Sequence, residues 1–330
     1  MNYSKKRLQW LWENTRGKHL IFILGIIGTV IYSSMQLVVP YFSGQIVDRF
    51  LTEDAAVKIV QERTLFYQLI FIMISLTLIR VVIVYLDCMA YEYVSQHALS
   101  KIKNFLYDKV QRQDMQFYAK YRTGDLMTRM TGDLDAVRHN IAWVIRAVIE
   151  SITLYGAASI YFFIMNWKLA LSVLITTPLI FIIILMFKKR VAPMHGLLRE
   201  KFALLNTNAQ ENISGNKVVK AFAREEYEIN KFDITNMDYC ENGKKTHLMW
   251  LKFFPYVETI ANILPVILMV VGGIFIIKGE LTMGEFVSFS GLIWAVSNPM
   301  RLLGNIMNEF QRFAAAADKV MEIYYSEPAI

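Results

Sequence analysis

Six charged side chains lie within or beside long apolar stretches of the sequence, where charge can serve the movement of ions or protons. They are Arg80, Asp87, Arg146, Glu150, Glu258 and Glu285. Charged groups are costly in a membrane, so each is a candidate functional residue. Arg146 and Glu150 are four residues apart, a spacing more typical of a local ion pair than of a relay. For the deeper Arg80 and Glu258, an aqueous cavity or a mutual pair explains the charge as well as a proton relay does.

No pattern of a catalytic centre accompanies these charges. The sequence contains neither a P-loop pattern for phosphate binding nor a dinucleotide fingerprint. The five histidines are scattered, and no spacing of cysteine and histidine fits a metal site. We therefore expect no catalytic residue, no cofactor site and no metal site in this chain.

Six long apolar stretches indicate that these charged residues lie in or near a membrane. They cover residues 20–47, 64–87, 143–165, 169–187, 253–277 and 283–303. Each has about 20 mostly apolar residues, the length that a helix needs to cross a bilayer core. Backbone groups in hydrocarbon must bond within their own segment, so each stretch is expected to be a helix. With 55% hydrophobic residues and a mean hydropathy of +0.34, the chain is predicted to be an all-α membrane protein with six transmembrane helices.

The loops between these stretches are alternately short and long, which places both long loops on one side of the membrane. Basic clusters lie at the ends of the stretches on that side: Lys5, Lys6, Arg7, Arg16, Lys18, Lys188, Lys189, Arg190, Lys244 and Lys245. By the positive-inside rule, the long loops and both termini are expected to be cytoplasmic. Acidic residues are interleaved throughout the loops, so nucleic-acid binding does not explain the net charge of +7.

The first long loop, residues 88–142, keeps a helical pattern well past the membrane, with apolar residues every three or four positions. Thr123 and Gly124 interrupt the pattern just after the aromatic pair Phe117-Tyr118. The loop is therefore expected to be a cytoplasmic helical hairpin with an aromatic tip.

The second long loop, residues 188–252, has the same organisation. Its helical pattern breaks at residues 214–216, and a short segment ending in Phe222 follows. Exposed aromatic groups at the ends of long stalks need a partner, such as another protein domain. The alternative left open is that Phe117, Tyr118 and Phe222 pack between the two hairpins.

Two short segments flank the helical region. Residues 1–18 are predicted to form an amphipathic segment that places Trp10 and Trp12 at the membrane interface, with a disordered basic tail as the alternative. Residues 19–325 are expected to form one six-helix domain. Pro328 stops the last helix, so residues 326–330 are expected to begin a linker to a further domain.

Taken together, these features resemble the transmembrane domain of ATP-binding-cassette exporters of the multidrug and lipid flippase type, which have the type IV fold. The matching strings are residues 40–48, Phe117-Tyr118, residues 123–129 with Asp133, residues 167–171 with Pro178-Leu179, residues 211–215 and residues 218–226. One such string is weak on its own. In this order and on this topology they are specific, and the resemblance covers essentially the whole chain.

The resemblance implies that the two tips are coupling helices that dock on ATP-binding domains. The first would comprise Phe117, Tyr118, Tyr121, Thr123, Gly124 and Asp125, and the second Gly215, Lys217, Val218, Lys220, Ala221 and Phe222. ATP and Mg would be bound by a nucleotide-binding domain that this chain lacks, either fused or a separate subunit. Two halves would form a homo- or heterodimer with exchanged helices and would switch between inward- and outward-facing states.

The sequence gives little indication of which residues contact the transported molecule. Seventeen methionines and many aromatic residues suit a deformable cavity for hydrophobic or amphiphilic molecules, although such residues also fill any helical bundle. Candidates that place polar or soft groups on apolar helices are Tyr32, Met35, Gln36, Asn262, Asn298, Asn305 and Met307.

Three functions remain open on the sequence. The leading expectation is a multi-pass exporter subunit in the plasma membrane of a bacterium. An ion-gradient-driven carrier would depend on Arg80 or Glu258 and not on ATP. A scaffold or receptor would bind a cytosolic partner through the stalks without transport.

Overall fold

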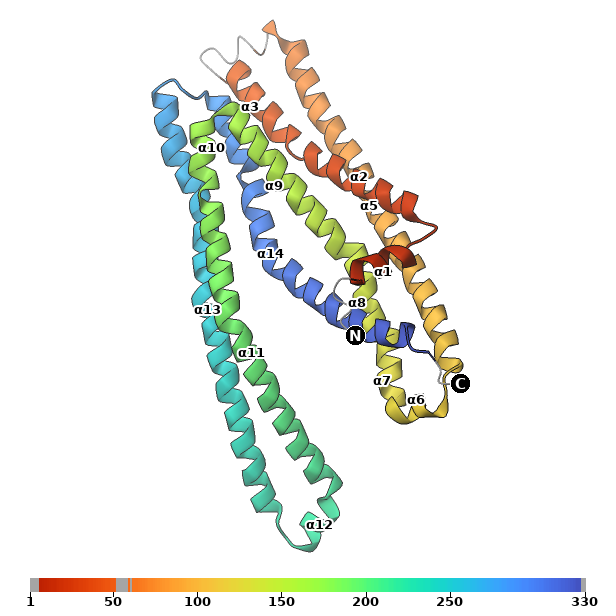
Figure 1. Cartoon of the computed structure of the whole chain (residues 1–330). Helices are drawn as coiled ribbons and strands as arrows, with labels where there is room; N and C mark the ends of the chain where they lie inside the picture. Colours follow the sequence, from red (N-terminus) through yellow and green to blue (C-terminus); the bar gives the residue numbers. More distant parts are fainter. Residues whose placement is uncertain (1–5, 52–58, 60, 328–330) are drawn as a thin grey trace. The chain divides into compact units, whose positions relative to one another are not determined.

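The computed structural model describes residues 6–51, 59 and 61–327, which contain helices and no strand (Figure 1). In chain order the helices are α1 (Arg7–Asn14), α2 (His19–Met35), α3 (Val38–Phe50), α5 (Arg63–Gln111), α6 (Met115–Lys120), α7 (Thr123–Thr128), η1 (Arg129–Asp133), α8 (Leu134–His139), η2 (Asn140–Val144), α9 (Ile145–Met165), α10 (Trp167–Leu174), α11 (Thr176–Ser214), α12 (Asn216–Ala221), α13 (Glu225–Ile277) and α14 (Met283–Tyr324). The two η segments are π-helical. The all-α prediction is confirmed.

Four helical stretches of the described chain are long and apolar enough to cross a membrane: His19–Phe50, Arg63–Gln111, Thr123–Met165 and Glu225–Ile277. The other two expected spans are also helical. Residues 169–187 fall in α10 and the start of α11, and residues 283–303 form the first half of α14. The first expected span is not one helix but two, α2 and α3. Pro40 lacks a backbone N–H and its ring clashes with a carbonyl four residues earlier, which accounts for the break before α3.

The chain divides into two compact units, and each is described by itself. Unit 1 comprises residues 1–173 and 267–330, and unit 2 comprises residues 174–266. Unit 1 therefore holds the first hairpin, and unit 2 holds the second. This division does not follow the order of the chain, because α14 packs back onto α3, α8 and α9.

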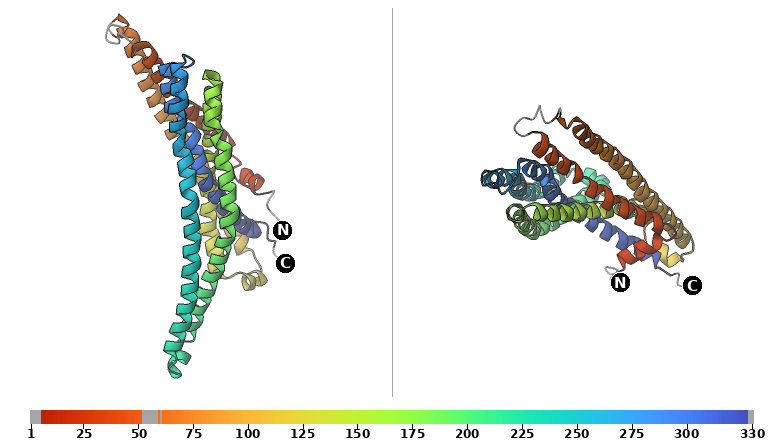
Figure 2. Two further views of the ribbon diagram at one scale, coloured as in Figure 1. Left: turned by 90° about the vertical axis from the view of Figure 1, so that its left-hand side faces the viewer. Right: turned by 90° about the horizontal axis from the view of Figure 1, so that it is seen from above.

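Unit 1 has one continuous core that joins the first hairpin, α1, the start of α2 and the end of α14. Its largest fully buried side chains include Trp10, Tyr91, Ile102 and Phe313. α1 lies beside the C-terminal part of α14 (Figures 1 and 2). Burial of apolar side chains at about 1.5–3 kcal/mol each makes this core the main stabilising element of the first hairpin.

The N-terminal segment differs from the sequence prediction in one respect. Trp12 is 42% exposed, as an interfacial residue would be, but Trp10 is only 1% exposed. The Trp10 ring packs edge-on against Tyr324, with ring centroids 5.7 Å apart. Arg7 donates two hydrogen bonds of 2.7 Å to the Asp318 carboxylate. These contacts attach α1 to α14. The two predicted flanking segments also include Met1–Lys5 and Pro328–Ile330, which lie outside the described residues.

At the other end of unit 1, α3 and α14 cross at very short distance. A Cβ atom on Gly44 would overlap the Gly284 carbonyl oxygen and the Ser288 hydroxyl. The Asp48 carboxylate accepts hydrogen bonds of 2.6 Å from the Thr282 hydroxyl and from the Gly284 N–H, at the first turn of α14. An anionic cap at a helix N-terminus is favourable because it satisfies free N–H groups and the helix dipole.

Unit 2 is a hairpin of α11 and α13 joined by α12. Polar pairs connect its two long helices: Lys201 and Asp238 form an ion pair of 2.7 Å, and Asn208 donates to Thr235 at 3.2 Å. Phe202 and Tyr239 add a ring contact with centroids 5.5 Å apart. Both predicted long loops are therefore helical hairpins.

Candidate functional site

The first tip consists of α6 and α7, and it is built around a buried aromatic ring. Asp114 accepts a hydrogen bond of 2.8 Å from the Phe117 N–H and so caps α6. Phe117 is 8% exposed and belongs to the core beneath the tip, together with Val110 and Leu126. The Phe117 ring thus faces the core of the chain, and its part in a docking surface stays a prediction.

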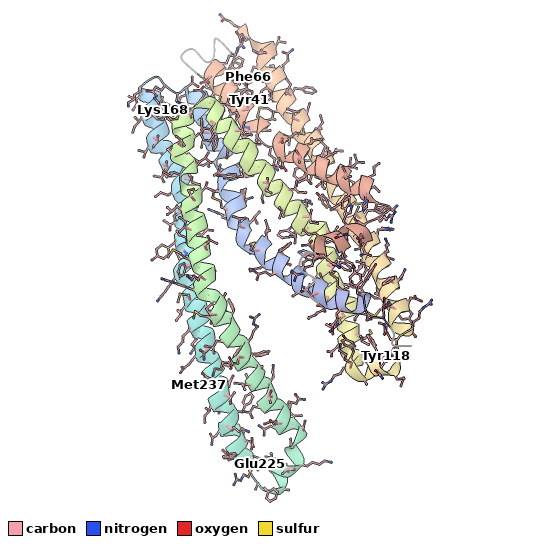
Figure 3. All side chains as sticks on the ribbon, viewed as in Figure 1. Tyr41, Phe66, Tyr118, Lys168, Glu225 and Met237 are labelled. Atoms are coloured by element: carbon pink, nitrogen blue, oxygen red, sulfur yellow. The ribbon has the colours of Figure 1, made fainter. Side chains whose placement is uncertain are left out.

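The exposed face of the first tip is formed by other residues. Tyr118 is 42% exposed and lies at the tip (Figure 3), where its hydroxyl donates to the Val110 carbonyl at 2.7 Å. Met115 is 83% exposed. Thr123, Gly124 and Asp125, at the start of α7, are exposed as well. The exposed surface of the first tip therefore includes Met115, Tyr118 and the first turn of α7.

Tyr121, another residue of the predicted first coupling helix, connects the tip to α14. Its hydroxyl donates to the Glu322 carboxylate at 2.6 Å. Arg129 donates to the other carboxylate oxygen at 2.7 Å, and to the Lys319 carbonyl at 3.0 Å. Gln113, at the base of the tip, donates to the Ser326 hydroxyl at 2.9 Å. The first tip and the last turns of α14 are thus held together by several hydrogen bonds.

Glu322 is the centre of this network, and its protonation state sets the strength of the connection. Partial burial raises the pKa of the Glu322 carboxyl, but hydrogen bonds from Tyr121 and Arg129 outweigh burial, so its pKa lies below the ordinary value of 4.5. A group whose pKa is lower in the folded state stabilises it above the ordinary pKa, and this contribution is lost as the pH falls through the folded-state pKa.

We expect Glu322→Gln to lower the thermal stability of unit 1 at pH 7 by about 1 kcal/mol, because a charged hydrogen-bond acceptor is replaced in a partly exposed site. The difference in Tm from wild type is expected to shrink below about pH 4.5, where the wild-type carboxylate becomes protonated. Thermal unfolding of the full-length protein at several pH values measures this. Glu327→Gln, at an exposed carboxylate five residues further, is the control. A Tm difference that is independent of pH would show that the charge of Glu322 has no part in the connection.

The second tip has the opposite character, because its aromatic residue points outward. Phe222 is 75% exposed and Val218 is 60% exposed. Lys217, Lys220 and Ala221 are exposed beside them, while Gly215 precedes α12. Glu225 lies at the same end of the hairpin (Figure 3). The tip thus combines an apolar pair with two basic residues.

The backbone after α12 fixes this presentation. Ala223 has a φ of +47°, a left-handed conformation that costs a non-glycine residue about 1–2 kcal/mol. The Arg224 N–H bonds the Val219 carbonyl at 3.0 Å, which closes the turn. Lys220 and Glu225 form an ion pair of 3.0 Å across it. The turn places Phe222 at the outer end of the hairpin.

The candidate cavity residues come from both units, and their role stays a prediction. Tyr32 is 2% exposed, and its hydroxyl donates to Glu150 at 2.8 Å, so it lies in a polar cluster inside unit 1. Asn298 and Asn305 are exposed and seven residues apart, which puts them on the same face of α14, with Met307 exposed nearby. Met35 and Gln36 are half-buried at the end of α2, and Asn262 belongs to unit 2. The face of α14 is the strongest remaining part of the prediction.

Sequence reasoning missed the residues that connect elements. Glu322 and Asp48 are ordinary charged residues in the sequence, and their partners lie far along the chain. The start of α6 could have been predicted from the sequence, because aspartate is a common N-cap residue and Asp114 directly precedes the helix. In the part of the chain that the structure describes, no group of His, Cys, Asp or Glu side chains is arranged to hold a metal ion.

Comparison with known proteins identifies the family of this helical arrangement. Residues 22–300 match the family model described as the ABC transporter transmembrane region. The chain is 32% identical over 230 residues to "Uncharacterized ABC transporter ATP-binding protein YknU" of Bacillus subtilis (strain 168), covering 70% of this chain and 39% of that protein.

Two further relatives have names that mention a transported molecule or a type of transport. The chain is 27% identical over 247 residues to "ATP-dependent lipid A-core flippase" of Syntrophus aciditrophicus (strain SB), covering 74% of this chain and 41% of the relative. It is 29% identical over 210 residues to "Probable multidrug resistance ABC transporter ATP-binding/permease protein YheI" of Bacillus subtilis, covering 62% and 35%. The chain spans less than half the length of these three relatives. With a family match over most of its residues, and with the long apolar helices of a multi-pass membrane protein, the chain belongs to the ABC transporter transmembrane region family.

Proposed function

We propose that the chain is the membrane-spanning half of an ATP-driven exporter that moves hydrophobic or amphiphilic small molecules or lipids out of the cytoplasm or the inner leaflet. The family match and the names of the flippase and multidrug relatives support this substrate range. ATP binding would drive the change from the inward- to the outward-facing state, and hydrolysis would reset it. ATP and Mg would be bound by an ATP-binding domain outside this sequence, as in relatives whose names contain "ATP-binding".

The observation that carries the proposal is the exposed apolar pair at the second tip. Val218 and Phe222 lie at the end of a long helical stalk, outside the apolar part of α11 and α13. Lipid cannot cover them there, and an exposed apolar group rimmed by charges indicates a protein interface. We infer that α12 docks on one ATP-binding domain, with Lys217 and Lys220 at the rim. The face with Met115, Tyr118 and the start of α7 would dock in the same way.

A second exporter half would cover the remaining apolar surface of unit 2. Exposed apolar side chains continue along the stalk: Leu197, Phe202, Leu204, Ile213, Ile229, Ile234, Met237 and Leu248. In water such a surface favours association, because burying it is worth about 25 cal/mol per Å². The proposed assembly is a homo- or heterodimer in the plasma membrane of a bacterium, with both termini and both tips in the cytoplasm. Residues 1–18 would lie at the membrane surface, and residues 326–330 would lead to the ATP-binding domain.

Transport by the purified full-length protein in proteoliposomes tests the proposal. With Mg-ATP we expect movement of a fluorescent lipid analogue or of a lipophilic dye such as rhodamine 6G, and the same probe is expected to stimulate ATP hydrolysis. Vanadate is expected to stop both. Transport driven by an ion gradient without ATP would instead support a carrier. Binding of a cytosolic partner with neither transport nor hydrolysis would support a scaffold.

A further inference from the structure

A cluster of polar and charged side chains lies inside unit 1, where α2, α5 and α9 meet at the end of the apolar part of α5. Its members are Thr29 and Tyr32 from α2, Asp87, Cys88 and Tyr91 from α5, and Arg146 and Glu150 from α9. These are the charged and titratable groups that face Asp87 from the described elements packed against it. The docking function described above uses none of them.

The two carboxylates of the cluster differ in the hydrogen bonds that they accept. Glu150 accepts a hydrogen bond of 2.8 Å from the Tyr32 hydroxyl. The side chain of Asp87 is 0% exposed, and within the described residues its Oδ2 atom has no hydrogen-bond donor. Arg146 Nε approaches that atom only to 3.8 Å, because the guanidinium donates through Nη1 to the Cys88 sulfur at 2.6 Å.

The charges of the cluster do not balance if both carboxylates are ionised. One guanidinium then faces two carboxylates, since Glu150 is one turn from Arg146 on α9 and Asp87 faces it from α5. An uncompensated buried charge costs several kcal/mol, so such groups become neutral or acquire a partner. One proton makes the cluster neutral. Asp87 is the better acceptor of that proton, because its side chain is fully buried and its Oδ2 atom has no donor, whereas Glu150 is only partly buried.

The surroundings of Asp87 suit the protonated acid. Thr29 Oγ1 lies 3.1 Å from Asp87 Oδ1 and 3.1 Å from the Gly25 carbonyl oxygen, and it has a single hydrogen to donate. If Oδ1 carries a proton, it donates to Thr29 Oγ1, and Thr29 donates to Gly25. Gly28 leaves room for this arrangement, because a Cβ atom there would be 3.2 Å from Oδ1.

We propose that Asp87 is a proton-binding site of this domain and holds a proton at neutral pH, while Glu150 remains ionised and accepts the hydrogen bond from Tyr32. When Asp87 loses the proton to water, the carboxylate attracts the guanidinium of Arg146, whose Nε already lies 3.8 Å from Oδ2, and strengthens the contact of α5 with α9. When Asp87 binds the proton again, this attraction is lost, and the hydrogen bond from Arg146 to Cys88 on α5 remains. The site thus links the presence of one proton to the contact between two helices, whatever the protein transports.

Infrared spectroscopy of the purified full-length protein in lipid nanodiscs tests the site without reference to transport or ATP. We expect a carbonyl band of a protonated, buried carboxylic acid at pH 7. The band is expected to shift when aspartate is labelled with ¹³C at the side-chain carboxyl, and to be lost in Asp87→Asn. Glu92→Gln is the matched control on α5, because Glu92 is a half-exposed carboxylate that receives Arg138, and it is expected to leave the band unchanged.

Glu150→Gln gives a second, independent result. With Glu150 neutral, Arg146 has one carboxylate left to pair with, so Asp87 is expected to ionise and the band to be lost at pH 7. The isotope shift reports a protonated aspartate without any substitution, and its loss in Glu150→Gln assigns the band to Asp87 even if Asp87→Asn does not fold. A wild-type spectrum at pH 7 with no isotope-sensitive acid band would overturn the proposal and would mean that Asp87 is ionised and paired with Arg146.

Discussion

Replacing Phe222 with alanine is expected to abolish transport while leaving the membrane domain folded. Phe222 is 75% exposed, and its side chain is outside any buried cluster of the described residues. Its removal should therefore cost little stability. If it fills a pocket of an ATP-binding domain, its loss should weaken docking by about 2–4 kcal/mol, the usual effect of truncating a central aromatic contact. The measurement is transport together with probe-stimulated ATP hydrolysis by the full-length protein.

The expected pattern is uncoupling, in which the probe still binds and basal ATP hydrolysis persists while stimulation and transport are lost. Leu251→Ala is the matched control, because Leu251 is 57% exposed on the same hairpin but away from the tip. Phe117→Ala is not equivalent, since Phe117 is in the core and its truncation would mainly lower stability. Wild-type transport by Phe222→Ala would contradict the assignment of α12 as a coupling helix.

The second large effect is expected at the crossing of α3 and α14. Gly44→Ala places a Cβ atom where the Gly284 carbonyl oxygen and the Ser288 hydroxyl lie. The backbone of α14 cannot yield at that point without disturbing its cap by Asp48. Overpacking of this kind costs about 1–3 kcal/mol, and more where the obstacle is backbone. A clear fall in Tm of the purified protein is therefore expected.

Gly304→Ala is the control for this prediction. Gly304 lies in the same α14, and a Cβ atom there would have nothing within 4 Å. Alanine is favoured over glycine in a helix by about 1 kcal/mol, so this variant should be as stable as wild type or more stable. If Gly44→Ala had the same Tm as Gly304→Ala, the two helices would not cross as closely as described.

The sequence predicts the helical class and the hairpins because those features depend on local patterns. Apolar runs of membrane-spanning length and helical periodicity beyond them can be read in any window of about 20 residues. The break inside the first expected span was also encoded, because Pro40 follows the polar residues Ser33, Ser34 and Gln36. What local patterns cannot supply is which side of a short helix is buried.

The two tips illustrate this limit. Phe117 and Phe222 look alike in the sequence, each beside a break at the far end of a hairpin. Phe117 is buried because α14 and α1 contribute to a core beneath the first tip, and Phe222 is exposed because unit 2 has no such neighbour among its own described residues. The bond between Tyr121 and Glu322 joins residues 201 positions apart, a distance that no local pattern spans.

The central claim is that the second tip docks on an ATP-binding domain. Its most direct test is site-specific photo-crosslinking, with a photoreactive phenylalanine analogue in place of Phe222 in the full-length protein in native membranes. Mass spectrometry of the crosslinked peptides then identifies the neighbour of α12. We predict adducts with an ATP-binding domain, fused or separate. Adducts confined to lipid or to other helices of this domain would contradict the account.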